Sequence, residues 1–351
     1  MSRILKFSLI TMVVAAILLP ATVALSGCGS STSSSTSTST STQAATTATT
    51  ASNVIGDRAL NMLASMPSSG DYANNSVTAD VLQQNLSQVY VLDIRQKADY
   101  AKGHIPGAKQ VDFSQWAAPE NLAKLPKNQK IVVVCYTGTT ATQAAAGLRM
   151  LGYDAVSLKG GMNGWAPNET QSQVINDLLN TSYPDVTTAS SLTAQPGMAA
   201  TFTTPSSADY QMLAEQANKV FSAMPTSGDF ANNTVSASGL SAMLNDPAKK
   251  DTLFVLDVRQ KADYAKGHIA GAVNIDLNAV ALPANLQLLP KDKKIVVVCY
   301  SGNTAGQVVT ALRMLDYDAV MLKYGMMSWD GTGKAAYLKY INAANKQVTT
   351  Q

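Results

Sequence analysis

Cysteine and histidine are scarce in this chain of 351 residues, which contains three cysteines and two histidines. Small secreted proteins that depend on disulfides use many more cysteines than this. Soft-ligand metal sites gather about four cysteine or histidine side chains around one ion, and these few residues are spread over the whole chain. The sequence therefore predicts neither a disulfide scaffold nor a metal site, and its motifs imply no cofactor.

Charge and aromatic side chains are also sparse. The formal net charge is +3, and aromatic residues make up 6% of the chain. A nucleic-acid-binding surface needs clustered positive charge, and no basic stripe is present. We therefore expect no nucleic-acid partner, and the sequence does not identify a protein partner.

The N-terminal segment has the pattern of a secretory signal. Arg3 and Lys6 precede an apolar run over residues 7–19, and residues 25–28 are Leu-Ser-Gly-Cys. The run is too short and wrongly flanked for a permanent transmembrane helix. Residues 25–28 resemble the bacterial lipoprotein signal box, which implies cleavage before Cys28 and lipid attachment to its sulfur. An ordinary signal peptide with an incidental cysteine is the alternative. A lipid on Cys28 would hold the protein on the extracytoplasmic side of a bacterial membrane.

Low-complexity segments divide the rest of the chain. Residues 28–52 are nearly all Ser, Thr, Ala and Gly, with too little apolar surface to offset ordering entropy, so we expect a flexible tether. Residues 184–207 are also rich in Ser, Thr, Ala and Pro, which predicts a linker with room to pack locally. With a signal peptide at 1–27, two domains remain, at 53–183 and 208–345.

The two predicted domains are copies of each other. Residues 95–105 return unchanged as 259–269, and residues 70–75 return as 228–233 with one substitution. Short β-branched runs alternate with helical segments in each copy. This pattern predicts an α/β fold of two tandem domains, each a mostly parallel sheet with helices on both faces. Each copy is long enough to bury a core of its own.

Each copy carries one cysteine in the same place. Cys135 and Cys299 each end a Val-rich run and open a glycine-containing loop before an Ala-rich helical segment. Parallel sheets bind ligands at the carboxyl ends of their strands. Loop amides and the helix dipole favour an anion there, and the thiolate is the nucleophilic form of cysteine. Cys135 and Cys299 are therefore the predicted nucleophiles.

Four ordered motifs in each copy resemble the rhodanese (sulfurtransferase) domain. In the first copy they are residues 92–95 (Leu-Asp-Ile-Arg), 103–108 (Gly-His-Ile-Pro-Gly-Ala), the loop 135–140, and 158–165 (Leu-Lys-Gly-Gly-Met-Asn-Gly-Trp). The resemblance implies that the cysteine thiolate attacks a small sulfane sulfur donor and becomes a persulfide. A thiol or cyanide acceptor then removes the outer sulfur.

The resemblance also implies roles for other residues of each copy. The implied substrate-binding residues are Tyr136, Thr137, Gly138, Thr139 and Thr140 in the first copy and Tyr300, Ser301, Gly302, Asn303 and Thr304 in the second. Asp93 and Arg95 are expected to pair and brace the loop, and His104 to form a structural hydrogen bond. The same support is expected from Asp257, Arg259 and His268.

Two departures from the family pattern bear on function. Many rhodanese loops end in Arg, which clamps an anionic donor with two hydrogen bonds, whereas these loops end in Thr140 and Thr304. Losing charged hydrogen bonding of this kind costs about 1.5–3 kcal/mol, so we expect weak thiosulfate turnover and a preference for polysulfides or organic persulfides. Tyr324 replaces a glycine of the closing motif and is expected to narrow the approach to Cys299. If only one cysteine works, this favours Cys135.

The sequence leaves three functions open. The first is a membrane-anchored extracytoplasmic sulfurtransferase. The second is a non-catalytic rhodanese-like module that binds or senses sulfur species or a protein partner. The two retained cysteines argue against this function, because a scaffold needs no exposed thiols. The third is a redox protein that uses Cys135 and Cys299 alternately, with an interdomain disulfide as the least favoured state.

Overall fold

The computed structural model describes residues 39–167, 175, 179, 182–343 and 345–350. From Thr46 onward the chain forms one compact unit. The predicted signal peptide (residues 1–27) and Cys28 lie outside the described residues. Among the residues that are described, no helix combines the length and the hydrophobicity needed to cross a bilayer.

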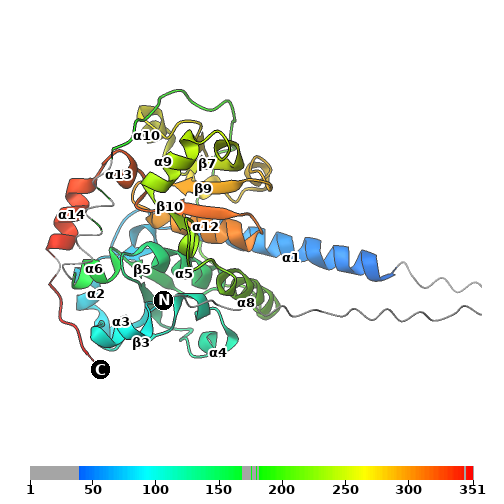
Figure 1. Ribbon diagram of the computed structural model, residues 1–351. Helices are drawn as coiled ribbons and strands as arrows, with labels where there is room; N and C mark the ends of the chain where they lie inside the picture. The colour runs from blue at the N-terminus through cyan, green and yellow to red at the C-terminus, as the bar shows by residue number, and fades with distance from the viewer. Residues whose placement is uncertain (1–38, 168–174, 176–178, 180–181, 344, 351) are drawn as a thin grey trace, which may run out of the picture. The chain divides into compact units, whose positions relative to one another are not determined.

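Each repeat contains a five-stranded sheet, within the described residues, in which all neighbouring strands are parallel (Figure 1). The strand order is β1-β5-β4-β2-β3 in the first repeat and β6-β10-β9-β7-β8 in the second. The strands are β1 Ser76–Val77, β2 Val89–Asp93, β3 Lys109–Gln110, β4 Lys130–Val134, β5 Ala155–Leu158, β6 Thr234–Val235, β7 Leu253–Asp257, β8 Val273–Asn274, β9 Lys294–Val298 and β10 Ala319–Leu322. The predicted fold of two tandem α/β domains is confirmed.

Helices connect the strands and cover the sheets. The α-helices are α1 Ser39–Ala64, α2 Ala79–Gln84, α3 Lys97–Lys102, α4 Pro119–Leu122, α5 Thr139–Met150, α6 Gly161–Trp165, α8 Ser207–Ser222, α9 Ala237–Asn245, α10 Lys261–Lys266, α11 Pro283–Leu286, α12 Asn303–Met314, α13 Gly325–Trp329 and α14 Lys334–Asn342. Short 3-10 turns are η1 Ala73–Asn75, η2 Leu86–Gln88, η3 Phe113–Gln115, η4 Ala231–Asn233, η5 Lys250–Thr252 and η6 Leu277–Ala279.

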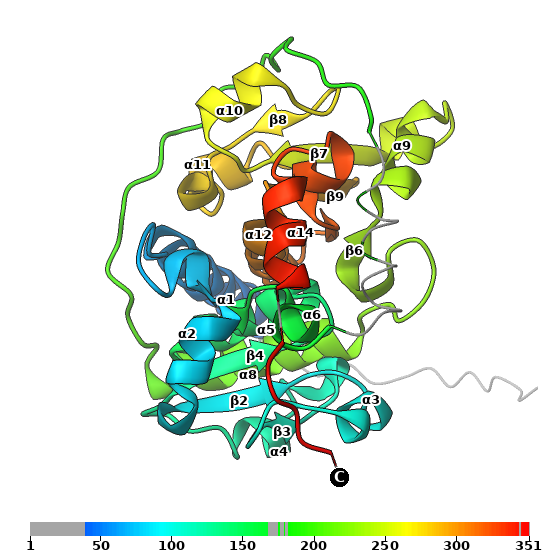
Figure 2. The ribbon, with the colours of Figure 1, turned by 90° about the vertical axis from the view of Figure 1, so that its left-hand side faces the viewer.

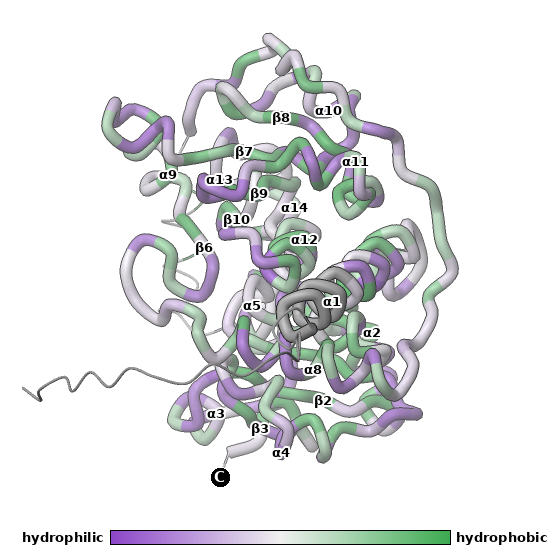
Figure 3. The backbone as a smooth tube through the Cα atoms, turned by 90° about the vertical axis from the view of Figure 1, so that its right-hand side faces the viewer, coloured by the Kyte–Doolittle hydropathy of each residue, from purple (hydrophilic) through white to green (hydrophobic). Residues whose placement is uncertain are grey.

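The central strands are buried on both faces, which explains their unbroken apolar sequences. Residues 131–134 of β4 and residues 295–298 of β9 are fully buried. Strands β2 and β7, which pair with them, are coloured as hydrophobic in Figure 3. The two cysteines follow β4 and β9 directly, so each lies at the carboxyl end of a rigid central strand.

The two repeats share a core. Apolar side chains from one face of each sheet and from helices α1, α5, α8 and α12 form a single buried cluster. The other face of each sheet packs a separate cluster. The prediction that each repeat buries a core of its own is therefore correct only for the clusters on the outer face of each sheet. Helix α5 of the first repeat packs against α12 of the second, where Thr310 Oγ1 donates to the Gln143 carbonyl at 3.0 Å. Helix α8, which precedes the second repeat, adds to the shared core by packing Phe221 against Trp116, with ring centroids 4.8 Å apart.

The expectation of a flexible tether through residue 52 is wrong from Ser39 onward, where α1 begins. Alanine has the highest helix propensity, and it recurs between Gln43 and Ala51. Extending a helix is much easier than starting one. Buried Ile55, Ala59 and Met62 anchor the second half of α1, so the Ala-containing stretch before them continues a helix that packing already holds.

The segment that follows each repeat crosses to the other repeat. We name residues 345–349, after α14, the C-terminal strap. The backbone N–H of Lys346 donates to the Trp165 carbonyl at 2.9 Å, and Trp165 Nε1 donates to the Gln347 carbonyl at 2.9 Å. Thr349 forms an antiparallel bridge with His104. Figure 2 shows this segment running from α14 past α6.

Residues 183–188, which we name the linker strap, do the same for the second repeat. The backbone N–H of Tyr183 donates to the Trp329 carbonyl at 2.7 Å, and Val186 forms an antiparallel bridge with His268. Further along, the Asn285 side chain exchanges hydrogen bonds with the backbone of Gln195. The segment predicted as a linker thus packs against folded structure over much of its length.

Candidate active site

Each cysteine loop turns back on its own sulfur. The backbone N–H of Gly138 donates to Cys135 Sγ at 3.0 Å, and that of Gly302 donates to Cys299 Sγ at 3.1 Å. Both glycines have left-handed backbones, with φ of 88° and 87°, which a residue without a side chain adopts without strain. Helices α5 and α12 begin at the next residue. Each sulfur therefore faces an amide and the unpaired N–H groups of a 12-residue helix, an environment that favours negative charge.

The closing motif supports each loop through its backbone. In the first repeat, Met162 N–H donates to the Cys135 carbonyl at 2.8 Å, and Asn163 N–H donates to the Tyr136 carbonyl at 3.1 Å. A Cβ on Gly161 would overlap the Cys135 carbonyl, so only glycine allows this approach. The second repeat has both bonds: Met326 N–H donates to the Cys299 carbonyl at 2.8 Å, and Met327 N–H donates to the Tyr300 carbonyl at 3.0 Å.

Both predicted nucleophiles are free thiols, and both are buried, with exposures of 2% for Cys135 and 1% for Cys299. The expectation of exposed thiols is therefore wrong. Tyr337 of the second repeat lines a cavity together with Thr137 and Gly138 of the Cys135 loop, and burial raises the pKa of Tyr337 well above its ordinary value. Tyr337 belongs to α14, the helix that leads into the C-terminal strap.

Tyr324 stands at the start of the closing motif of the second repeat, where the first repeat has Gly160. Its backbone is next to the Cys299 loop, since a Cβ on Gly302 would lie 3.1 Å from the Tyr324 nitrogen. Its ring packs edge-on against Tyr337 of α14, with centroids 5.8 Å apart. The expectation that Tyr324 narrows the approach to Cys299 stays a prediction.

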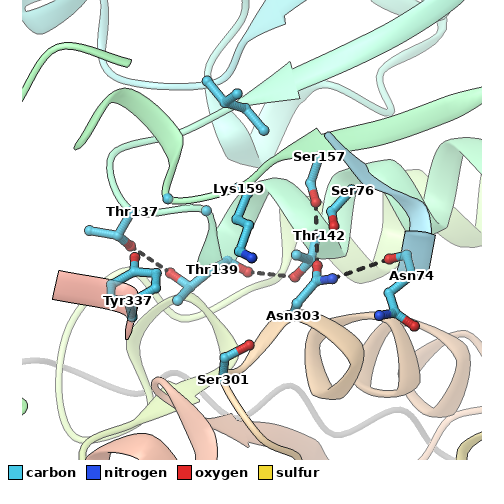
Figure 4. Close-up of a pocket in the computed structure, with 13 residues that line it drawn as sticks. Asn74, Ser76, Thr137, Thr139, Thr142, Ser157, Lys159, Ser301, Asn303 and Tyr337 are labelled. Atoms are coloured by element: carbon cyan, nitrogen blue, oxygen red, sulfur yellow. Dashed lines mark hydrogen bonds between the residues drawn. The ribbon is translucent and has the colours of Figure 1, made fainter. Parts of the chain in front are cut away.

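A cavity of about 120 Å³ lies between the two loops (Figure 4). Thr137 and Thr139 line it from the first loop, and Ser301 and Asn303 from the second. Asn303 bridges the repeats, because its Oδ1 accepts from Ser157 Oγ at 3.4 Å and its Nδ2 donates to the Asn74 carbonyl at 3.1 Å. The structure thus brings both predicted loops to one polar cavity, which the sequence did not reveal.

A reciprocal set of hydrogen bonds joins the repeats beside this cavity. We name it the Asn–Gln clamp, formed by Asn75 with Gln307 and by Asn233 with Gln143. Asn75 Nδ2 donates to Gln307 Oε1 at 2.8 Å, and Asn233 Nδ2 donates to Gln143 Oε1 at 3.2 Å. The glutamines also donate hydrogen bonds: Gln307 Nε2 to the Asn74 carbonyl at 2.9 Å, and Gln143 Nε2 to the Asn232 carbonyl at 3.0 Å. The repeated Gly-Asp-x-Ala-Asn-Asn sequence therefore holds the two post-cysteine helices together.

The hydroxyls of Tyr136 and Tyr300 form hydrogen bonds with Asp99 and Asp263, two residues to which the sequence alone assigned no role. Tyr136 Oη donates to Asp99 Oδ2 at 2.7 Å, and Tyr300 Oη donates to Asp263 Oδ2 at 2.7 Å. Burial, followed by this hydrogen bond, raises the pKa of both tyrosines to about 12. These tyrosines fasten the start of each loop to α3 and α10. The Ala-Asp-Tyr sequence at the same place in both repeats was the signal for the two aspartates.

Asp93 and Asp257 end strands β2 and β7, and each forms a buried ion pair with the arginine two residues later. Arg95 Nη2 donates to Asp93 Oδ2 at 2.6 Å and to the Gly103 carbonyl at 2.8 Å. In the second repeat, Arg259 Nη2 donates to Asp257 Oδ2 at 2.7 Å. Removing one partner of a buried pair leaves an uncompensated charge, so each pair fixes the strand end beside its cysteine loop.

The two histidines contact backbone rather than the sulfurs. His104 stacks on Tyr100, with ring centroids 3.8 Å apart, and its Nδ1 is 2.9 Å from the Tyr100 carbonyl. His268 is stacked on Tyr264 in the same way, and its Nε2 is 3.1 Å from the Thr188 carbonyl of the linker strap. Across the described ranges, no group of three or more His, Cys, Asp and Glu side chains could hold a metal ion.

Comparison with known proteins identifies the family. The model of the rhodanese-like domain matches residues 78–168 and 236–332, once in each repeat. The chain therefore belongs to the rhodanese family, with two tandem rhodanese-like domains.

Two curated relatives are single-repeat matches. A protein named sulfurtransferase from Allochromatium vinosum is 34% identical over 96 residues, which cover 26% of this chain and 88% of the relative. The thiosulfate sulfurtransferase GlpE of Pseudomonas paraeruginosa is 36% identical over 85 residues, 24% of this chain and 74% of the relative. Two other relatives are matched over only 20% of their length. Among solved structures, a rhodanese-like domain protein from Staphylococcus aureus is 32% identical, with a TM-score of 0.25, covering 27% of this chain and 93% of that chain.

Proposed function

We propose that this protein is a sulfurtransferase that carries sulfane sulfur as a persulfide on Cys135, and on Cys299 where that site is competent. The observation that carries the proposal is the amide N–H directed at each sulfur, 3.0 Å from Cys135 and 3.1 Å from Cys299, at the start of a long helix. Such an arrangement stabilises both a thiolate and an anionic persulfide. The family and the relatives named as sulfurtransferases support it.

The chemistry takes two balanced steps. In the first, the thiolate attacks the terminal sulfur of a donor such as a hydropolysulfide monoanion, an S–S bond to cysteine forms, and a hydropolysulfide shorter by one sulfur leaves with the proton. In the second, a thiolate or cyanide attacks the outer sulfur, the S–S bond breaks, and the cysteine thiolate is restored. With cyanide the product is thiocyanate. No base is required in either step once the thiolate is present.

The polar cavity favours small donors of low charge. Its volume is about 120 Å³, and the cysteines beside it are buried, so a bulky donor would have to displace α14. Thr140 and Thr304 stand where many rhodaneses have Arg, and among the described residues that line the cavity only Lys159 is charged. We therefore propose polysulfides or small organic persulfides as donors, with thiosulfate a poor one.

Steady-state thiocyanate formation tests the proposal. The full chain is assayed with polysulfide and with thiosulfate, alongside Cys135→Ser, Cys299→Ser and the double variant. We expect turnover with polysulfide that the double variant abolishes, and thiosulfate turnover that rises roughly tenfold or more in Thr140→Arg, the effect of one charged hydrogen bond. Equal thiosulfate activity in the wild type and Thr140→Arg would contradict the donor assignment. Turnover that survives in the double variant would contradict the persulfide.

A second candidate is a non-catalytic module that binds or senses sulfur species, and the burial of both thiols favours it. A sensor would take up one sulfur without releasing it to cyanide. Persulfide that forms on Cys135 but stays bound in excess cyanide would therefore select this candidate. Rapid thiocyanate release would select the enzyme.

We also propose that lipid on Cys28 anchors the protein on the extracytoplasmic side of the membrane. The support is the apolar run over residues 7–19 followed by Leu-Ser-Gly-Cys at 25–28. Labelled fatty acid should be incorporated into the full chain and not into Cys28→Ser. Equal labelling of both would contradict the anchor.

A further inference from the structure

Both repeats form a groove between the short helix and the edge strand beside their histidine. We name them the α3–β3 groove, in the first repeat, and the α10–β8 groove, in the second. Residues 95–105 and 259–269 have the same sequence, so a lysine, a tyrosine and an alanine of the helix line each groove at matching positions. The two grooves therefore offer a bound segment the same helix side chains.

The linker covers the α10–β8 groove. The Ser190 N–H donates to the Tyr264 hydroxyl at 3.3 Å, and the Thr188 carbonyl lies 3.1 Å from His268 Nε2. Residues from 189 to 196 form the outer wall of the groove, and Figure 2 shows the linker passing α10. This wall is uncharged, consists mainly of small residues and has no regular secondary structure. The second repeat thus shows what kind of segment such a groove holds.

The α3–β3 groove has no such cover within the described part of the chain. A cavity of about 410 Å³ lies there, and the described residues that line it all belong to residues 97–110. The Tyr100 hydroxyl donates to the Ala108 carbonyl at 2.6 Å but accepts no hydrogen bond from the described residues. His104 is 5% exposed, and its Nε2 also has no hydrogen-bond partner among them. Buried polar groups nearly always have partners, so these two atoms point to a missing segment.

The α3–β3 groove also carries more positive charge than its counterpart. Lys109 lines it, whereas the second repeat has Val273 at that position. Lys97 lines it as well, and the acid on the same helix, Asp99, is already paired with Lys102 at 2.8 Å. Complementary charge selects partners and orients them. A segment that fits this groove is therefore acidic rather than neutral.

We propose that the α3–β3 groove binds an acidic, irregular segment of small residues from a partner protein, in the way that the α10–β8 groove holds residues 188–196. The backbone of the segment contacts the Tyr100 hydroxyl and His104, its small side chains pass Ala101, and an acidic side chain lies at Lys109. The binding is non-covalent and requires neither cysteine. The first repeat is thus a docking module as well as a sulfur-transfer domain.

Photo-crosslinking of the full chain tests the proposal. The probe is a synthetic peptide with the sequence of residues 188–196, blocked ends, a photoreactive residue in place of Leu192 and the change Thr193→Asp. We expect saturable crosslinking to residues 97–110, with a dissociation constant of roughly 0.1–1 mM, because the peptide lacks the high effective concentration of a tethered linker. The same peptide with Thr193 retained should bind about threefold more weakly.

Two pairs of variants separate docking from non-specific binding. Ala101→Trp fills the groove and should abolish the crosslink, whereas the same change at the exposed Ala123 should not. Lys109→Glu should remove the preference for the acidic peptide, whereas Lys124→Glu, an equal change in charge outside the groove, should keep it. Thermal unfolding verifies that each variant is folded.

Three results would overturn the proposal. They are crosslinking that does not saturate or that maps away from residues 97–110, unchanged crosslinking in folded Ala101→Trp, and equal binding of the acidic and neutral peptides by the wild type. Thiocyanate formation by Lys109→Glu should equal that of the wild type, so failure of the docking proposal leaves the proposed sulfur transfer intact.

Discussion

Asn75→Gly should destabilise the protein through the Asn–Gln clamp. Asn75 is 2% exposed, and its amide donates to Gln307 Oε1 at 2.8 Å, so its loss leaves a buried acceptor without a partner. That costs about 1–3 kcal/mol of unfolding free energy. Asn75 has φ of 51°, which glycine accepts without strain, so this change removes the side chain only. Asn75→Ala should cost about 1–2 kcal/mol more, because alanine must adopt a left-handed backbone.

Urea unfolding of a double-mutant cycle measures the clamp. Asn75→Gly, Gln307→Ala and the pair should show a coupling of about 1 kcal/mol, within the range for residues in one buried network. Asn233→Gly is the matched control, since its bond to Gln143 is longer at 3.2 Å and should cost less. Additive single changes, or a larger loss at Asn233, would refute the reasoning.

Two further predictions follow from the straps. Truncation after residue 343 removes the hydrogen bonds of the C-terminal strap to Trp165 and His104, which should lower the free energy of unfolding by about 2–4 kcal/mol and speed hydrogen exchange around His104. Lys346→Ala breaks only the ion pair with the exposed Asp80 and should cost about 1 kcal/mol or less. Unchanged exchange at His104 after the truncation would refute the role of the strap. Burial, followed by the charge of Asp330, raises the pKa of Asp185 in the linker strap from 3.8 to about 6. Because the pKa of Asp185 is higher in the folded protein than in the unfolded chain, protonated Asp185 favours folding. This contribution to stability is complete below the unfolded pKa of 3.8 and is lost as pH rises through about 6. Asp185→Asn should therefore gain thermal stability relative to the wild type as pH rises through this window, and a pH-independent difference would contradict the assignment.

Local sequence was sufficient for the fold of each repeat. The Val-rich runs before Cys135 and Cys299 are strands β4 and β9, and the Ala-rich segments after the loops are α5 and α12, because burial on both faces of a parallel sheet demands continuous apolar residues. The pairing of Asp93 with Arg95 spans only two positions, and their proximity also follows from local geometry.

Long-range contacts between the repeats could not be read from the sequence. Asn75 and Gln307 are 232 residues apart, and nothing in either local pattern requires them to meet. Tyr337 of the second repeat lines the cavity at the Cys135 loop of the first, and α8 packs across the boundary into the shared core. Each of these follows from the way the second repeat docks onto the first, which composition and periodicity do not encode.

The most direct test of the central claim is the intact mass of the reduced full chain after polysulfide treatment, with Cys135→Ala and Cys299→Ala measured beside it. We expect the addition of one sulfur to Cys135 that cyanide removes, absent in Cys135→Ala and retained in Cys299→Ala. A folded, fully reduced protein that gains no sulfur on Cys135 would contradict it.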